Sequence, residues 1–398
     1  MKPTLGRSSL SLACCLGTCL GIFVLFVPPA SAQVNGPGPS PSSSFELVLN
    51  LPGDEAVISD GIGFSSGQTT QLNVREGGIV AGGFNVIGNS EVNISGGSVG
   101  GGFDARSGCE VNISGGTVGE RFNTLSDTVV NISGGTVGDR FGAYSTSQVN
   151  ISGGSVGDRF RANSDSEVNI SGGTVGDRFS ALPYSLVNIS GGIVGVFFEA
   201  DSSIVNIAGG TVGDCFSAEL YSVVNISGGA IGLFFRVRDL GLVNISGGTF
   251  GAGFTAASGG EVNLQGSEFS IDGTPLDNLQ FGQPVMITDR DVTLSGVLAD
   301  GEPFSFDLNT SFITDGDFFS PEATLTVELV QNFLLGDCNE DLIVNFQDIA
   351  PMIDILSSVS FVEQADCNQD GVVNFFDVQP FIEILANSMG LNLSLIHI

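Results

Sequence analysis

One phrase recurs, as VNISGGTVGDRF and close variants, along about half of the chain. The intervals between its Asn residues are 20, then 19 five times, then 18 once and 19 three times. They are Asn73, Asn93, Asn112, Asn131, Asn150, Asn169, Asn188, Asn206, Asn225, Asn244 and Asn263. A unit of this size cannot fold alone, because four or five buried side chains at roughly 2 kcal/mol each do not offset ordering its backbone at about 1 to 2 kcal/mol per residue. The units must therefore stack on one another.

Each unit has the alternation of a β-strand. Around Asn169, Val168 and Ile170 share one face, while the Asn and the following Ser face the other way. A Gly-Gly pair then suits a corner, and apolar residues recur beyond it at fixed offsets. We therefore predict a mainly β chain: a parallel β-solenoid (β-helix) over 45–264, in which each repeat unit forms one coil. Each coil is expected to contain a strand, a corner, a short strand and a second corner.

The ends of such a stack need caps, because an open coil would pair with other chains. We assign residues 45–74 to the N-terminal cap of the solenoid and residues 265–332 to a β-rich C-terminal cap. Within the second cap we expect strands at 285–288, 292–298, 304–308 and 324–330. Residues 299–302 are expected to form the hairpin turn between two of them.

The first 32 residues have the pattern of a signal peptide, with Lys2 and Arg7 followed by an apolar run and a small-residue cleavage site. A membrane span is disfavoured, since the run is short and ends in two prolines. A linker rich in Gly, Pro and Ser follows at 33–44. We expect a secreted, extracellular or cell-surface protein with no membrane span after cleavage. Nucleic acid is excluded as a partner, because 43 acidic and 12 basic residues give a net charge of -31.

The composition changes near the C-terminus, where residues 337–398 include ten acidic residues and no Lys or Arg. Two matching segments occur there, DCNEDLIVNFQD at 337–348 and DCNQDGVVNFFD at 366–377. Each offers side-chain oxygens at loop positions 1, 3, 5, 9 and 12 and a backbone carbonyl at position 7, which is the shell that Ca²⁺ requires. The predicted ligands are Asp337, Asn339, Asp341, Ile343, Asn345 and Asp348, and then Asp366, Asn368, Asp370, Val372, Asn374 and Asp377.

A short amphipathic helix is expected after each loop. Its apolar positions are Ile349, Met352, Ile353 and Leu356 in the first copy and Val378, Phe381, Ile382 and Leu385 in the second. A loop followed by one helix, present twice within 333–388, resembles the F-hand pair of type I dockerins. The resemblance implies a small all-α domain with two Ca²⁺ sites and a cohesin-like or other cell-surface protein as partner.

The sequence departs from the dockerin pattern at two places. Leu342 replaces the Gly expected at loop position 6, so we expect the second loop, which keeps Gly371, to bind Ca²⁺ more readily. Positions 10 and 11, where dockerins commonly contact cohesin, are unusually apolar here, with Phe346-Gln347 in the first loop and Phe375-Phe376 in the second. The whole chain resembles secreted solenoid proteins of planctomycete-like bacteria, which implies a surface or matrix protein. Residues 389–398 fit neither helix nor loop pattern.

Two functions remain open. The repeats place Asp139, Asp158 and Asp177 in one column, and pairs of acids on a β-helix could serve a polysaccharide lyase or glycosidase. Against this, the column repeats, the short coils leave no long loops for a cleft, and the single histidine is His397. We therefore predict a non-catalytic structural or adhesive protein with an extracellular polysaccharide as a candidate partner. The alternative is a polysaccharide-degrading enzyme.

Two further expectations concern repeated residues. The Asn column predicts a ladder of stacked side-chain amides, although eight Asn-Ile-Ser triplets also match the glycosylation sequon. Cys338 and Cys367 share loop position 2, so a disulfide between them stays open.

Overall fold

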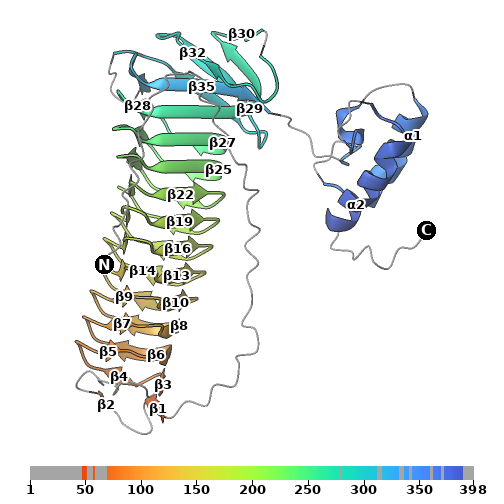
Figure 1. Cartoon of the computed structure of the whole chain (residues 1–398). Helices are drawn as coiled ribbons and strands as arrows, with labels where there is room; N and C mark the ends of the chain where they lie inside the picture. The colour runs from red at the N-terminus through yellow and green to blue at the C-terminus, as the bar shows by residue number, and fades with distance from the viewer. Residues whose placement is uncertain are drawn as a thin grey trace, which may run out of the picture. The chain divides into compact units, whose positions relative to one another are not determined.

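The computed structural model describes residues 47–51, 57–58, 70–277, 279–311, 316–330, 336–339, 343–358, 362–368 and 372–388. The signal segment 1–32, the linker 33–44 and the tail 389–398 lie outside the described residues. The described strands from Leu47–Leu51 to Glu261–Ile271 stack coil upon coil in parallel, which confirms the predicted parallel β-solenoid (Figure 1). No described helix is long and apolar enough to cross a membrane.

Each central coil contains three strand segments, where two were predicted. The first carries the Asn, the second follows the Gly-Gly corner, and the third follows a further corner at Gly-Asp-Arg. In one coil these are β16 (Glu167–Ile170), β17 (Thr174–Val175) and β18 (Ser180–Ala181). The first two segments join a 24-stranded sheet and the third joins an 11-stranded sheet. The sequence interpretation missed one corner because the second and third segments are very short.

The strands of each kind lie in register one coil apart. The first segments are β1 (Leu47–Leu51), β3 (Thr70–Val74), β6 (Glu91–Val99), β8 (Glu110–Val118), β10 (Val129–Ile132), β13 (Gln148–Ile151), β16, β19 (Leu186–Ile189), β22 (Ile204–Ile207), β25 (Val223–Ile231), β27 (Leu242–Phe250) and β29 (Glu261–Ile271). The separate second segments are β2 (Val57–Ile58), β4 (Ile79–Val80), β11 (Thr136–Val137), β14 (Ser155–Val156), β17, β20 (Ile193–Val194) and β23 (Thr211–Val212). In β6, β8, β25 and β27 one nine-residue strand spans both segments.

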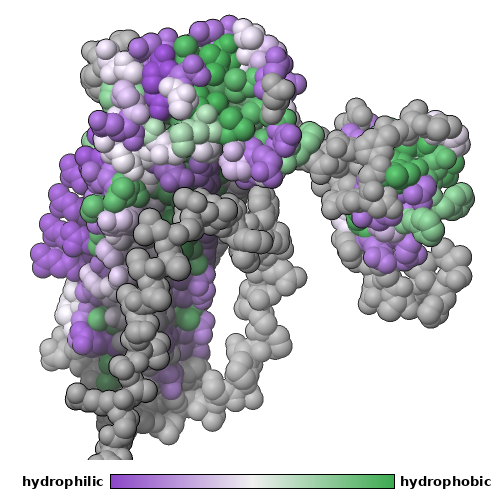
Figure 2. Space-filling model, turned by 45° about the horizontal axis from the view of Figure 1, so that its top comes forward, coloured by the Kyte–Doolittle hydropathy of each residue, from purple (hydrophilic) through white to green (hydrophobic). Residues whose placement is uncertain are grey.

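The third segments form the second sheet. They are β5 (Asn85–Val86), β7 (Asp104–Arg106), β9 (Asn123–Leu125), β12 (Gly142–Ala143), β15 (Arg161–Ala162), β18, β21 (Glu199–Asp201), β24 (Ser217–Glu219), β26 (Arg236–Val237), β28 (Thr255–Ala256) and β34 (Phe318–Phe319). The side of the coils seen in Figure 2 is mainly hydrophilic, as expected for the outer face of a rod with an internal core.

The core consists of the predicted internal columns. Val168 and Ile170 are at most 1% exposed, so the predicted faces are correct. Phenylalanine rings from ten successive coils form one column with centroids 4.6 to 5.5 Å apart, and all neighbouring rings are stacked except the first pair, Phe84 and Phe103, which are tilted. The column contains Phe84, Phe103, Phe122, Phe141, Phe160, Phe179, Phe198, Phe216, Phe235 and Phe254. Offset aromatic stacking adds to the burial of each ring.

The Gly-Gly corner is required by the closeness of neighbouring coils. Gly173 has a φ of 73°, which a residue with a Cβ rarely adopts. A Cβ on Gly172 would lie 2.5 Å from the carbonyl oxygen of Ser152 in the previous coil. Every central coil meets its neighbour about equally closely, so the Gly-Gly pair recurs at this corner in each of them.

The N-terminal segment is more regular than predicted. β1 pairs in parallel with β3 and places Asn50 opposite Asn73. This strand therefore belongs to the solenoid. The repeat period did not predict this strand, because the interval between these two Asn is longer than the period.

The C-terminal cap contains β30 (Thr274–Pro275), β31 (Val285–Met286), β32 (Thr293–Leu298), β33 (Pro303–Asp307) and β35 (Thr324–Leu329). β32 and β33 form the predicted antiparallel hairpin. The cap also continues the solenoid, because β34 pairs in parallel with β28 and β35 with β29.

The C-terminal module contains η1 (Phe346–Asp348), α1 (Ile349–Ser357), η2 (Glu363–Ala365), η3 (Phe375–Asp377) and α2 (Val378–Ser388). The two copies share one core, made by Cys338, Val344, Met352, Ala365, Cys367, Phe381 and Leu385. The predicted apolar face of the first helix is partly wrong: Ile349 and Ile353 are 38% and 58% exposed. Met352 is buried and Leu356 packs against the core as predicted, and Ile355, which was not predicted, packs there too.

Candidate functional sites

The repeated asparagines form the predicted amide ladder. The side-chain amide of Asn169 donates to Oδ1 of Asn150 at 3.0 Å, and its Oδ1 accepts from Asn188 at 2.8 Å. The same bond links every neighbouring pair from Asn50 to Asn263 at 2.8 to 3.1 Å. Each amide therefore has a structural role in the stack.

The aspartates of the predicted column link neighbouring coils by hydrogen bonds. Oδ1 of Asp139 accepts the backbone N–H of Asp158 at 3.0 Å, and Oδ1 of Asp158 accepts that of Asp177 at 3.0 Å. Asp177 and Asp214 repeat this contact with the backbone N–H groups of Val196 and Leu233. These carboxylates satisfy corner N–H groups that no strand pairing reaches.

The next column contains Arg121, Arg140, Arg159 and Arg178, one on each of four successive coils. All four have φ near 60°, the left-handed conformation of a tight corner. Arg140 pairs with Glu120 at 3.2 Å. Arg121, Arg159 and Arg178 form no ion pair within the described part of the chain.

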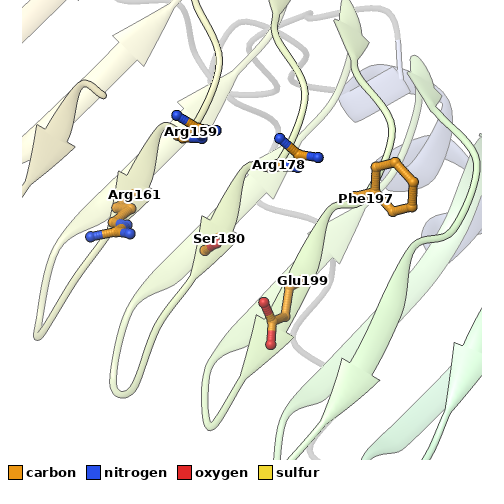
Figure 3. Close-up of a pocket in the computed structure, with 6 residues that line it drawn as sticks. All are labelled: Arg159, Arg161, Arg178, Ser180, Phe197 and Glu199. Carbon is orange, nitrogen blue, oxygen red and sulfur yellow. The ribbon is translucent and has the colours of Figure 1, made fainter. Parts of the chain in front are cut away.

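A shallow hollow of about 380 Å³ lies on this side of the coils. Figure 3 shows its residues in two rows on three successive coils: Arg159, Arg178 and Phe197 in one row, and Arg161, Ser180 and Glu199 in the other. The guanidinium carbon of Arg178 lies 5.9 Å from the centroid of the Phe197 ring, a cation–π contact. Sequence reasoning identified the arginine column but not this hollow.

Three carboxylates gather beside the hollow on two neighbouring coils. Asp201 lies opposite Glu219 in the sheet, and Glu219 is buried and paired with Arg238 at 2.5 Å. Partial burial raises the pKa of Glu199, and the negative charges of Glu219 and Asp201 raise it further. The Glu199 carboxyl is therefore easier to protonate than an ordinary glutamate.

The two C-terminal loops place their last acid in matching positions. Asp348 is fully buried, and its two carboxylate oxygens accept the backbone N–H groups of Asn339 at 3.1 Å and Asn345 at 2.8 Å. In the second loop, Asp377 is equally buried and accepts from Asn368 at 3.1 Å and Asn374 at 2.7 Å. Each oxygen retains lone-pair capacity beyond the hydrogen bond that it accepts.

The first acids of the loops are buried too, with Asp337 2% and Asp366 6% exposed. The position-9 residues act as helix caps, since Oδ1 of Asn345 accepts from the N–H of Gln347 and Oδ1 of Asn374 from that of Phe376, both at 2.8 Å. Their amides donate to the position-7 carbonyls, from Asn345 to Ile343 at 3.2 Å and from Asn374 to Val372 at 3.1 Å.

The position-5 acids, Asp341 and Asp370, lie outside the described residues, as do Leu342 and Gly371. Among the residues that are described, no three His, Cys, Asp or Glu side chains form a metal-binding group.

The cysteines are free thiols where they are described, including Cys338 and Cys367. Burial, together with nearby negative groups, raises the pKa of each of these two thiols to about 12. Both therefore stay protonated at neutral pH.

Comparison with protein-family models, with curated proteins and with solved structures gave no match to this chain.

Proposed function

We propose that this chain is a secreted, non-catalytic structural or adhesive protein of a cell surface or matrix, docked through a C-terminal module that binds Ca²⁺. The observation that carries the proposal is the use of the repeated polar residues within the stack. Amides of the asparagine ladder bond to one another, and carboxylates of the aspartate column bond to backbone N–H groups. Groups committed in this way build a long, rigid support.

The calcium part of the proposal rests on buried acids. Asp337 and Asp348 are buried within one twelve-residue loop, and Asp366 and Asp377 within the other. Residues 337–398 contain no Lys or Arg to neutralise them. Carboxylates held close together in a poorly hydrated site repel one another, and a bound cation removes that cost. Hard carboxylate and carbonyl oxygens suit Ca²⁺, which would be held by the ligands predicted from the sequence.

The docking part rests on exposed aromatic side chains next to the ligands. Phe346 is 58% exposed, and Phe375 and Phe376 are 86% and 78% exposed. Phe375 and Phe376 are neighbours in the chain, and a cluster of exposed apolar side chains is typical of a protein interaction site. We propose a cohesin-like or other cell-surface protein as the partner, with calcium holding the loops that present these side chains.

The alternative function is degradation of a polysaccharide. It is favoured by Glu199, whose pKa is raised and which shares its surroundings with Asp201 and Glu219. A protonated acid beside an ionised one is the arrangement that glycosidases use.

One experiment separates the two functions. The full-length chain is incubated with a panel of neutral and acidic polysaccharides, and newly formed reducing ends and unsaturated products are measured. The structural proposal expects no product. Turnover that is lost in Asp158→Ala or in Glu199→Gln would replace it with the enzymatic alternative.

A further inference from the structure

We propose that the hollow lined by Arg159, Arg161 and Arg178 is a binding site for an acidic polysaccharide that lies along the coils. This inference deepens the proposed adhesive function and rests on it, because it names the class of ligand and the surface that holds it. We call these three residues with Ser180, Phe197 and Glu199 the arginine patch.

The first observation is unpaired positive charge in a strongly acidic chain. With 43 acidic and 12 basic residues, a surface arginine has many carboxylates available to it. Even so, Arg159, Arg161 and Arg178 form no ion pair within the described ranges. All three are exposed on two successive coils, so their charges repel one another. An external anion would remove this repulsion.

The second observation is why nearby acids do not neutralise the patch. Asp158 and Asp177 each precede a patch arginine in the sequence, but Oδ1 of each accepts a backbone N–H from the following coil. Arg161 lies opposite Gly142 in one neighbouring coil and Ser180 in the other, and neither carries a charge. These carboxylates keep their charge, but none of the described ones lies within ion-pair distance of a patch arginine.

The third observation is the shape of the surface. The arginine column places one arginine on each of four successive coils, whose backbones lie about 4.8 Å apart at the strand spacing, and Arg159 and Arg178 are its two members in the patch. Arginine recognises carboxylate and sulfate-like oxygens with paired hydrogen bonds. Phe197, which is 51% exposed, adds an apolar ring at one end of the hollow; Arg178 lies over this ring, and a sugar ring could pack on the part that stays exposed.

An acidic peptide fits this surface less well. An extended peptide presents side chains on one side only every second residue, about 6.8 Å apart, which does not match the spacing of the coils. A polysaccharide carries its charges on stiff rings, and several arginines can contact one such chain. Glu199 is the one acid of the patch. When ionised, its carboxylate repels an anionic ligand, and protonation removes this repulsion.

The test measures binding of the full-length chain to immobilised dextran sulfate and polygalacturonate, which separate sulfate from carboxylate recognition. Neutral dextran and poly-L-glutamate are the comparison probes. The patch variant carries Arg159→Asn, Arg161→Gln and Arg178→Asn, because Asn tolerates the left-handed backbone at 159 and 178. The matched control carries Arg75→Gln, Arg106→Gln and Arg236→Gln, which removes the same charge elsewhere on the solenoid.

A second pair of variants tests the site without removing any corner residue. Ser180→Glu adds a carboxylate inside the patch at a position where the next coil already has Glu199. Thr174→Glu adds the same charge at an exposed position of β17, outside the patch. Both chains should keep the fold, so a difference in binding reports on the patch.

We expect at least about tenfold weaker binding to one or both acidic polysaccharides in the patch variant and in Ser180→Glu. The two controls should stay within about twofold. Equal weakening in variants and controls, no binding to either polyanion, or tighter binding of poly-L-glutamate would overturn the site. Binding through another surface would leave the adhesive function standing, whereas product release would sink that function and leave the patch intact.

Discussion

The hydroxyl of Thr326 donates a 2.6 Å hydrogen bond to Oδ1 of Asn263. These residues lie opposite each other in neighbouring parallel strands, so a cap threonine takes the next place in the asparagine column. A hydroxyl can satisfy the last amide oxygen without offering an amide to a further coil. The ladder therefore ends where the solenoid ends.

The amide ladder should contribute directly to stability. In Asn169→Ala, the amide bonds to Asn150 and from Asn188 are both lost. We expect the free energy of unfolding to fall by about 1 to 3 kcal/mol, since each such bond contributes about 1 kcal/mol and a half-buried partner is left unpaired. Chemical denaturation measures the change. Thr174→Ala, an exposed change in the same coil, should leave stability nearly unaltered, and an equal loss there would contradict the role of the ladder.

The phenylalanine stack offers a sharper comparison between two adjacent residues. Phe198 is fully buried between Phe179 and Phe216, with ring centroids 4.7 Å away on each side, whereas Phe197 is 51% exposed. We expect Phe198→Ala to destabilise the solenoid by about 3 to 5 kcal/mol, through lost burial and a cavity. Phe197→Ala should cost less than about 1 kcal/mol in thermal or chemical unfolding. Similar losses in both variants would mean that the ring columns are wrongly placed.

A single carboxylate should hold the last coil to the cap. Asp317 accepts backbone N–H groups from Gly253 at 3.0 Å, Phe254 at 2.8 Å and Asp307 at 3.1 Å. Asp317→Ala leaves these donors without the acceptor, so we expect a loss of about 2 to 4 kcal/mol. Hydrogen exchange should locate the loss at β28 and β33. Glu322→Ala, at an exposed cap position, is the control, and unchanged exchange in Asp317→Ala would refute the prediction.

Binding of dextran sulfate to the arginine patch should depend on pH through Glu199. The pKa of this carboxyl is raised by partial burial and by Glu219 and Asp201, while Arg238 opposes the shift. Protonation removes a negative charge from the patch, so affinity should rise as pH falls toward and through the raised pKa. Sulfate groups keep their charge over this range, so the change reports on the protein. Glu199→Gln should bind more tightly at neutral pH with a flatter pH profile, and an unaltered profile would exclude Glu199.

Much of the solenoid is predictable because the Asn-containing phrase recurs at a nearly constant interval in the sequence. Val168 and Ile170 face inward as the alternation around Asn169 requires, and the Asn ladder follows from the same register. Asn50 was missed because its interval to Asn73 does not match the period. β34 and β35 complete the last coils from far along the chain, and no local pattern specifies which distant strand will pair.

The candidate sites were likewise predictable only in part from the sequence. The arginine column follows from the period, but the hollow depends on Phe197 and Glu199, which break the repeat at neighbouring positions. In the C-terminal module the proposed Ca²⁺ ligands follow from a local loop pattern. The exposure of Ile349 and Ile353 does not, because Val344, Cys338 and the second copy decide which side of the short helix is covered.

The most direct test of a calcium-ordered module is the number of Ca²⁺ ions that the full-length chain binds after treatment with chelator, measured by equilibrium dialysis. We predict two tightly bound ions, with one lost in Asp348→Asn and one in Asp377→Asn, because each change removes a buried carboxylate from one loop. The second loop, which keeps Gly371, should fill first. Asp158→Asn, in the solenoid, is the control and should retain both ions. Binding that is absent, or that is unchanged in both loop variants, would contradict the proposed role of calcium.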